Sequence, residues 1–262
     1  MKKGLLPIVF CLLILPIASR AQFDEVGIIF GCSNYSGDLT ERDIEPLECN
    51  MANGIFVRKN LNRQFGLKMQ IARLVLSGND ANNTMEGGLW KRNLSFRSDL
   101  YELGAQVEWV PISLKTGDNQ FMPYFFTGIA AFYFNPRAEM GGNVYNLHHY
   151  KTEGVEYSLF QFAIPFGAGI KLNLRNRGSL GFELGLRKTF TDYLDDVSNT
   201  YRSDIRLLGE NNSLAAQLSY RGIEGNLSDA PLYPKPGTQR GNPDKMDWYA
   251  LFGMTIGVNL SR

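Results

Sequence analysis

The chain has 262 residues, with 27 basic and 26 acidic side chains and a formal net charge of +1. This balance provides no surplus of cations to neutralise phosphates, so nucleic acid is not an expected partner. Two histidines and three cysteines leave little material for a zinc site, and we expect no metal and no cofactor. The 27 glycines and the 12% of aromatic residues favour a β-rich fold over a helical bundle.

The first 21 residues have the three parts of a secretory signal peptide. Lys2 and Lys3 give a positive start, Leu5–Ile17 is apolar, and Ser19-Arg20-Ala21 is a small-x-small cleavage site. The apolar run is shorter than the roughly 20 residues of a membrane-spanning helix. We therefore expect residues 1–21 to be a signal peptide and residues 22–262 to form one exported domain. Glycines and charges interrupt its later apolar runs, which leaves a β-barrel as its way of entering a membrane.

Eight segments have the composition of membrane-spanning strands, which alternate a lipid-facing apolar residue with a small or polar residue facing the lumen. In Phe65–Leu76, for example, Phe65, Leu67 and Met69 lie opposite Gly66 and Lys68. Two segments carry apolar residues on both faces, so their orientation stays open: Met51–Lys59 and Tyr124–Phe134. The other five segments are Glu25–Ser33, Asp99–Val110, Phe160–Leu172, Leu180–Phe190 and Trp248–Leu260.

The connections between these strands alternate in length. Three of them are short or moderate: Asn60–Gln64, Pro111–Gln120 and Asn173–Arg177. The other four are all longer: Gly37–Asn50, Ser77–Arg97, Asn135–Val155 and Thr191–Asp247. This order is typical of an outer-membrane barrel with long extracellular loops and short periplasmic turns. The sequence therefore predicts an all-β fold, an eight-stranded antiparallel transmembrane β-barrel. A soluble lipocalin-like barrel or sandwich is the alternative, but its outer face would carry more charge.

Charges of both signs fall on the predicted lumen face. An unpaired charge inside a narrow barrel would cost several kcal/mol, so we expect these side chains to form a structural plug of ion pairs. A gated ion path or a catalytic carboxylate pair is the functional alternative. The six residues are Lys68, Glu102, Glu108, Lys171, Glu183 and Arg187.

Cys32 and Cys49 are the only cysteines after the predicted signal peptide, and they flank the first long loop. Antiparallel pairing of the first two strands could bring them together, and an exported protein can form disulfides. Two unpaired thiols or a reactive nucleophile are the alternatives. No catalytic motif with a known spacing occurs in the chain, so we expect a protein that is not an enzyme.

The last long loop has features of its own. Ser213 can cap a short helix in which Leu214 and Leu218 share a face. Asp192, Asp195 and Asp196 do not have the spacing of a calcium-binding EF-hand loop, so we expect a solvated, turn-favouring cluster. A loop of this length can serve as a lid, a docking platform or a flexible rim.

Several segments resemble a family of outer-membrane barrels that carries a domain-of-unknown-function label and includes the PorG component of type IX secretion. The most specific are Asn34-Tyr35-Ser36-Gly37-Asp38-Leu39 and Thr191-Asp192-Tyr193-Leu194-Asp195-Asp196-Val197-Ser198. Weaker matches are Tyr101–Glu108, Pro123–Ala130 and the helix segment Leu214–Ser219. The resemblance covers almost the whole mature chain, but Cys32 and Cys49 are not part of it. It implies a non-enzymatic component of the secretion and gliding machinery, associated with a periplasmic ring built from a lipoprotein and its partner.

We therefore expect a scaffold in the cell outer membrane, with membrane lipid and a periplasmic ring as its partners and no small-molecule substrate. A small porin- or adhesin-type barrel that acts through its surface loops is the alternative, and a lipid-modifying barrel enzyme is a third. The predicted periplasmic side has a basic cluster that could steer an acidic partner, although solvation or lipid phosphates would explain it equally well. The cluster is Lys59, Arg63, Lys115, Arg175, Arg177 and Arg262, with docking assigned to Arg63, Arg175 and Arg177.

Overall fold

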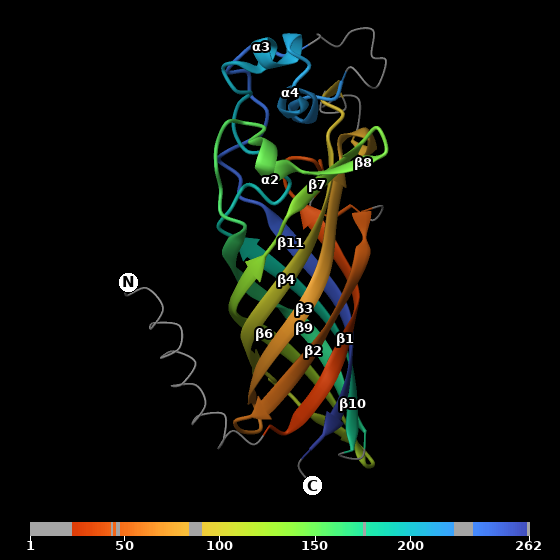
Figure 1. Cartoon of the computed structure of the whole chain (residues 1–262). Helices are drawn as coiled ribbons and strands as arrows, with labels where there is room; N and C mark the ends of the chain where they lie inside the picture. The colour runs from red at the N-terminus through yellow and green to blue at the C-terminus, as the bar shows by residue number, and fades with distance from the viewer. Residues whose placement is uncertain are drawn as a thin grey trace, which may run out of the picture.

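The structure is a computed structural model that describes residues 23–42, 44–45, 48–83, 91–174, 177–222 and 233–260. The predicted signal peptide lies outside these residues. Eight long strands run up and down around a common axis (Figure 1). They are β1 (Glu25–Ser36), β2 (Asn50–Asn60), β3 (Phe65–Asn79), β4 (Ser95–Trp109), β6 (Asn119–Tyr133), β9 (Phe160–Leu174), β10 (Gly178–Thr189) and β11 (Trp248–Asn259).

These strands close into an antiparallel barrel. Each strand pairs with the next one along the chain, including β4 with β6 and β6 with β9. The first and last strands then pair over their full length, from Glu25 opposite Asn259 to Ser36 opposite Trp248. Closure leaves no open sheet edge along the barrel wall. The prediction of an eight-stranded antiparallel barrel is confirmed.

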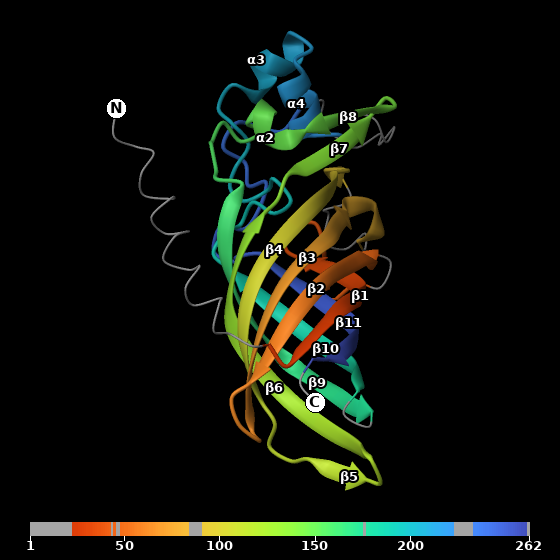
Figure 2. The same cartoon turned by 60° about the horizontal axis from the view of Figure 1, so that its bottom comes forward.

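The two ends of the barrel differ. At one end, called here the short-turn end, residues 61–64 join β2 to β3 and residues 175–177 join β9 to β10. The connection from β4 to β6 lies at the same end and contains the three-residue strand β5 (Leu114–Thr116), which pairs with β6 beyond the barrel wall (Figure 2). Residues 37–49, 80–94, 134–159 and 190–247 form the connections at the other end.

The described residues of these four long connections form an ordered structure over the barrel mouth, which we call the cap. It contains a hairpin of β7 (Pro136–Met140) and β8 (Asn143–Asn146), in which β7 also pairs with β4. Its helices are η2 (Asp80–Asn82), α2 (Leu147–Tyr150), α3 (Ile205–Glu210) and α4 (Leu214–Ser219) (Figure 1). No helix among the described residues is long and apolar enough to span a membrane.

The helix expected after Ser213 is present as α4, and Leu218 is buried on its inner side. The expected N-cap is not, because the Ser213 side chain makes no hydrogen bond to the helix. Instead the backbone N–H groups of Ala216 and Gln217 bond the Ser213 carbonyl oxygen. The hydroxyl group therefore does not contribute to the start of this helix.

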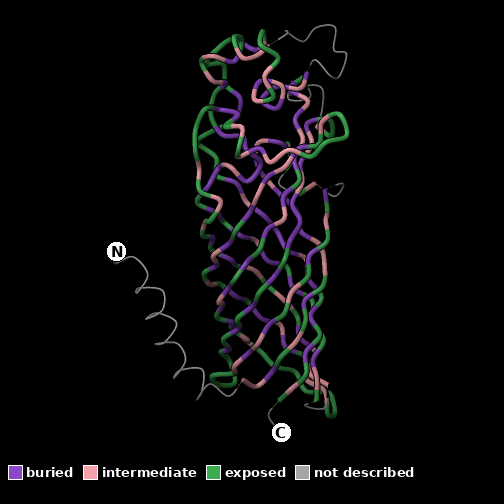
Figure 3. The backbone as a smooth tube through the Cα atoms, viewed as in Figure 1, coloured by how far each residue is buried: buried purple, intermediate pink, exposed green. Residues whose placement is uncertain are grey.

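Side chains alternate between lumen and exterior along every barrel strand, as the buried and exposed residues show (Figure 3). The structure also orients the two ambiguous strands. In β2, Phe56 and Arg58 point inward and Ile55 points outward. In β6, Tyr124 and Phe126 are inward, and Phe125 is outward. These inward aromatic side chains fill lumen space that polar residues fill elsewhere.

The lumen has two zones. Near the cap it is apolar, and this apolar core continues without a break into the cap itself. Leu74, Phe132 and Leu251 from the barrel therefore belong to the same cluster as Leu194 and Leu218 from the cap. The sequence predicts small and polar residues along the whole lumen. In the structure they lie mainly in the half nearer the short turns. The cap thus packs on the barrel as part of one hydrophobic core.

The outer wall is apolar. On each of the eight strands, at least one large hydrophobic residue has more than half of its own surface exposed. A soluble monomer does not expose so continuous an apolar surface. The most exposed example on each strand, in chain order, is Phe30 58%, Ile55 59%, Ile71 57%, Leu103 56%, Ile129 71%, Phe162 58%, Phe182 62% and Val258 58%.

Replacing Leu184 with Arg tests this surface, because Leu184 is exposed near the middle of β10 and of the apolar belt, where a charge is costly. We expect a loss of about 2–4 kcal/mol in the free energy of unfolding. Phe190→Arg is the matched control: Phe190 is also exposed but lies just beyond the end of β10, where about 0–1 kcal/mol is expected. Denaturant unfolding in lipid vesicles measures both values, and equal losses would contradict the assigned belt.

Candidate functional site

Eight charged side chains are buried in the lumen. Six of them lie nearer the short turns, and the Glu102–Arg187 pair lies further toward the cap, beside Phe132 and Tyr249 of the apolar core. Four are carboxylates and four are cations, so the buried charge balances. All eight are nearly inaccessible, with relative exposures between 0 and 7%. They are Glu25, Glu102, Glu108, Glu183, Arg58, Lys68, Lys171 and Arg187.

Arg58 is the centre of the group nearest the short turns. Its guanidinium donates to Glu25 at 2.6 Å and to Glu108 at 3.0 Å, and so links residues of three different strands. The guanidinium carbon also lies 4.9 Å from the centre of the Phe56 ring, a cation–π contact. Lys171 approaches the Glu25 carboxylate at 3.8 Å from the other side. Each carboxylate here therefore faces at least one cation.

Two further ion pairs cross the lumen from wall to wall. Lys68 of β3 donates to Glu183 of β10 at 2.6 Å, and the Tyr124 hydroxyl donates to the same carboxylate at 2.9 Å. Arg187 of β10 donates to Glu102 of β4 at 3.2 Å. Gln70 and Tyr249 also donate to Glu102, at 2.7 and 2.8 Å. Such saturation of buried carboxylates is what a low-dielectric interior requires.

All six lumen charges predicted from the sequence lie in this network, and each contacts a charge of opposite sign. Sequence reasoning missed two members, Glu25 and Arg58. Glu25 stands at the very start of its strand. Arg58 lies in β2, where apolar residues on both faces hid the orientation. The only signal for Arg58 is its position two residues after Phe56, which puts both side chains on the same face of β2.

Cys32 and Cys49 form a disulfide in the structure, with their Cα atoms 5.7 Å apart. The bond joins the cap end of β1 to the residue just before β2. It closes a loop with a sequence separation of 17. A loop of this size contributes about 3 kcal/mol in chain-entropy terms, so the disulfide fixes the first connection of the cap.

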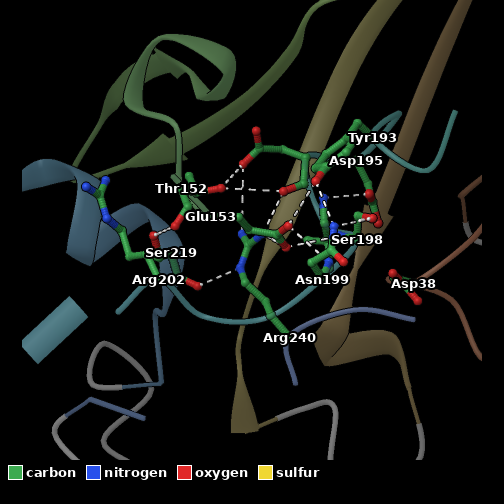
Figure 4. Close-up of polar contacts among 12 residues, drawn as sticks. Asp38, Thr152, Glu153, Tyr193, Asp195, Ser198, Asn199, Arg202, Ser219 and Arg240 are labelled. Carbon is green, nitrogen blue, oxygen red and sulfur yellow. Dashed lines mark hydrogen bonds and ion pairs between the residues drawn. The ribbon is translucent and has the colours of Figure 1, made fainter. Parts of the chain in front are cut away.

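A second charged network holds the cap together (Figure 4). Arg240 donates to the Glu153 carboxylate at 2.9 Å and to the carbonyl oxygens of Asp196 and Ser219. Glu153 in turn accepts the backbone N–H groups of Ser198 and Asn199, both at 3.0 Å. The two longest connections are thereby tied to each other through one buried carboxylate and one buried guanidinium.

Arg92 ties the second long connection to the same network. It binds the Asp80 carboxylate with two hydrogen bonds, at 2.8 and 2.7 Å. It also donates to the Asp38 carbonyl oxygen at 2.7 Å and to that of Arg240. All four long connections therefore meet at polar contacts of Arg92 and Arg240.

The prediction of a solvated cluster at Asp192, Asp195 and Asp196 is wrong. Their exposures are 4%, 1% and 1%, and Asp195 and Asp196 contact Tyr35 and Tyr157, respectively. Burial raises the pKa of the Asp192 carboxyl to about 7 and that of Asp196 to about 6. Among the described residues, no group of three or more His, Cys, Asp or Glu side chains is arranged to hold a metal ion.

Cations are exposed at the short-turn end, as expected. Arg63, Lys115 and Arg177 are all exposed, and Arg63 lines a surface hollow of about 520 Å³ together with Pro111 and Ile112. Lys59 is different, because it pairs with Asp24 at 3.0 Å. The predicted docking residue Arg175 lies outside the described residues, as does Arg262.

Comparison with known families supports the sequence resemblance in part. A family model described as a domain of unknown function, DUF6089, matches residues 3–215, which is well over half of the chain. The chain belongs to the DUF6089 family. The match includes both lumen ion pairs that cross the barrel, and it includes Asp192, Asp195 and Asp196 of the cap. No curated protein sequence matches this DUF6089 chain.

Several solved outer-membrane barrels are similar to this chain at low identity. The N-terminal β-barrel domain of Pseudomonas aeruginosa OprF is 10% identical and covers 91% of this chain and 98% of its own, with a TM-score of 0.38. Yersinia pestis Ail in complex with the heparin analogue sucrose octasulfate is also 10% identical (coverage 91% and 100%, TM-score 0.41). A major outer membrane protein from Thermus thermophilus is 11% identical (90% and 99%, TM-score 0.35). The fold assignment therefore rests on this chain's own strand pairing.

The Lys68–Glu183 pair allows a test of the lumen network. Lys68→Met should cost about 3–5 kcal/mol in unfolding free energy, because it leaves a buried carboxylate without its cation. Adding Glu183→Gln should restore much of that loss, since the remaining amide can still accept from Tyr124. Arg73→Met is the control: Arg73 pairs with Asp99 on the exposed wall, where a pair contributes about 1 kcal/mol or less. Strictly additive losses in the double variant would argue against a coupled pair.

Proposed function

We propose that this DUF6089 protein is an outer-membrane barrel that acts as a structural anchor and not as a channel or an enzyme. The observation that carries the proposal is the filled interior. Ion pairs and the apolar core shared with the cap together fill the lumen, with most of the ion pairs nearer the short turns. A barrel filled in this way offers its surfaces for function: the wall, the cap and the short-turn end.

The wall has the dimensions of a membrane-spanning belt. Exposed aromatic pairs mark both of its borders on β4 and β6: Tyr101 opposite Tyr133 near the cap, and Trp109 opposite Phe125 near the short turns. The two pairs are eight positions apart along β4, or about 27 Å at ~3.4 Å per residue. A strand tilt of about 40° reduces this to roughly 21 Å along the axis, close to the height of an outer-membrane apolar band.

We further infer that the assembly it anchors is a type IX secretion and gliding assembly, with a periplasmic ring of a lipoprotein and its partner as the protein docked at the short-turn end. The inference rests on the sequence resemblance to the family that includes PorG. The surface at that end supports it. Arg63 and Lys115 make no ion pair with any residue in the described ranges, and the hollow beside Arg63 lies between the β2–β3 turn and the residues before β5.

A porin- or adhesin-type barrel acting through its surface loops is the second candidate. The observation that favours its adhesin form is the cap, which is a folded platform and not a set of loose loops. The cap exposes apolar side chains at Val144 (66%) and Leu207 (60%). In this case the partner would bind the cap end, and the short-turn end would contact lipid headgroups and solvent only.

Orientation can be tested by single-cysteine labelling in a background with Cys32 and Cys49 replaced. Cysteines at exposed cap positions, such as Arg206 and Lys235, should react with impermeant maleimides on intact cells. A cysteine at Arg63 should react only after the outer membrane is permeabilised. Labelling of Arg63 on intact cells would reverse the proposed orientation.

Docking can be tested by charge reversal. Converting Arg63, Lys115 and Arg177 together to Glu should leave the barrel assembled but reduce recovery of the ring with the barrel at least severalfold at low salt. The difference from wild type should shrink at higher salt, because salt screens these exposed charges. The matched control reverses three exposed cations of the cap: Arg42, Arg206 and Lys235. If ring recovery falls in the cap variant and not in the short-turn variant, the docking surface is the cap. Assembly is checked by heat-modifiable migration on gels.

A further inference from the structure

The buried charge of the cap is not balanced as it is in the lumen. The described residues outside the barrel strands bury seven carboxylates but only two guanidiniums, those of Arg92 and Arg240. Each guanidinium is already committed, Arg92 to Asp80 and Arg240 to Glu153. Asp195 and Asp247 are 1% and 0% exposed and have no cation within ion-pair distance among the described residues. Some other positive charge must compensate them.

Tyr35 lies between these two carboxyl groups. Its hydroxyl oxygen is 2.6 Å from Asp195 Oδ2 and 3.2 Å from Asp247 Oδ1. A phenol has a single hydrogen, so it can donate along only one of these contacts. The other contact is favourable only if the carboxyl oxygen itself carries a hydrogen and donates to the phenol oxygen. The three oxygens therefore need two hydrogens, one more than Tyr35 supplies.

The remaining oxygens identify where the additional proton fits. Asp195 Oδ1 accepts the Val197 N–H at 2.9 Å, and Asp247 Oδ2 accepts the Leu194 N–H at 2.8 Å. These two oxygens already face hydrogens. Only the pair that faces Tyr35 is left to hold the proton. Gly37 closes one side of the site: a Cβ there would lie 2.0 Å from Asp247 Oδ1 and 2.1 Å from the phenol oxygen.

We propose that Asp195 and Asp247 share one proton through Tyr35 and that this proton locks the cap onto the barrel. Tyr35 belongs to β1, whereas Asp195 and Asp247 lie at the two ends of the longest connection, next to β10 and β11. The shared proton thus links β1 to both ends of the longest connection. Releasing it leaves two facing carboxylates without compensation and opens this contact.

The charged groups around Asp195 and Asp247 also favour protonation of the pair. Asp38 and Asp192 face the pair from the first and last connections, and Arg92 is the cation on the remaining side. Burial, together with the charge of Asp38, raises the pKa of Asp195 well above its usual value, and burial with the charge of Asp195 does so for Asp247. A raised carboxyl pKa means that the docked cap binds more protons than the undocked cap. Docking is therefore most stable in acid and is lost as pH rises through the docked pKa.

The neighbouring carboxyls also affect the pH dependence of docking. Asp196 and Asp192 lose their contribution between the usual carboxyl value of about 4 and their docked pKa values of about 6 and 7. Asp38 and Asp80 also have raised pKa values, so the loss assigned to the Asp195–Asp247 pair is the part that Asp247→Asn removes. One linked proton changes the docking equilibrium by up to about tenfold for each pH unit.

Hydrogen exchange of the Leu194 and Val197 amides in the full chain, held in detergent micelles, tests the lock between pH 7 and 9. After correction for the intrinsic exchange rate, protection in the wild-type protein should fall by up to about tenfold per pH unit. Asp247→Asn is a neutral replacement whose amide can donate to Tyr35 while its oxygen accepts from Leu194. It should remove the slope. Asp244→Asn, three residues away and exposed, should keep the wild-type slope.

A flat wild-type profile, or equal slopes in Asp247→Asn and Asp244→Asn, would overturn the proposal. Recovery of protection at pH 9 on adding millimolar calcium would overturn it too, because a cation and not a proton would then balance the charge. Asp195→Asn provides the same test if Asp247→Asn does not fold. Unchanged heat-modifiable migration across the pH range shows that the cap, and not the barrel, has opened.

Discussion

A narrow barrel with charged residues on its inner wall can exist only if those charges are paired inside it. An eight-stranded lumen is just wide enough for its own side chains, so little water is available to solvate a lone charge. The chain meets this constraint with four carboxylates and four cations. The position of Arg58 between Glu25 and Glu108, and the pairs that join opposite walls of the lumen, follow from that pairing.

The cap continues the barrel interior, but it is held together by an apolar core and by contacts of two arginines. Its apolar side chains join the barrel core, so the barrel mouth is covered by packed structure. Its polar contacts gather around Arg92 and Arg240, which serve all four long connections. Because the described parts of these connections bury more carboxylates than cations, the cap depends on the protonation of its aspartates in a way that the barrel does not.

The strands could be predicted from the sequence because lipid on one side and a crowded lumen on the other impose a period of two. The prediction weakened where large aromatic residues fill the lumen, as Phe56 and Tyr124 do, since both faces then look apolar. The structure of the cap could not be predicted from the sequence for another reason. Asp192, Asp195 and Asp196 have the composition of a solvated turn, and only long-range packing against Tyr35 and Arg240 buries them. The β7–β8 hairpin likewise has no alternating pattern long enough to detect.

The wall-to-wall ion pairs also bear on how such a barrel is completed. Lys68 and Glu183 are 115 residues apart in the chain and sit on strands that are not neighbours. Neither can find the other in a half-built sheet, and Tyr249 on the last strand reaches Glu102 on the fourth only once the ring of strands is shut. These cross-lumen contacts therefore stabilise only the closed barrel, whereas contacts such as Arg58–Glu25 already fit within a pair of neighbouring strands.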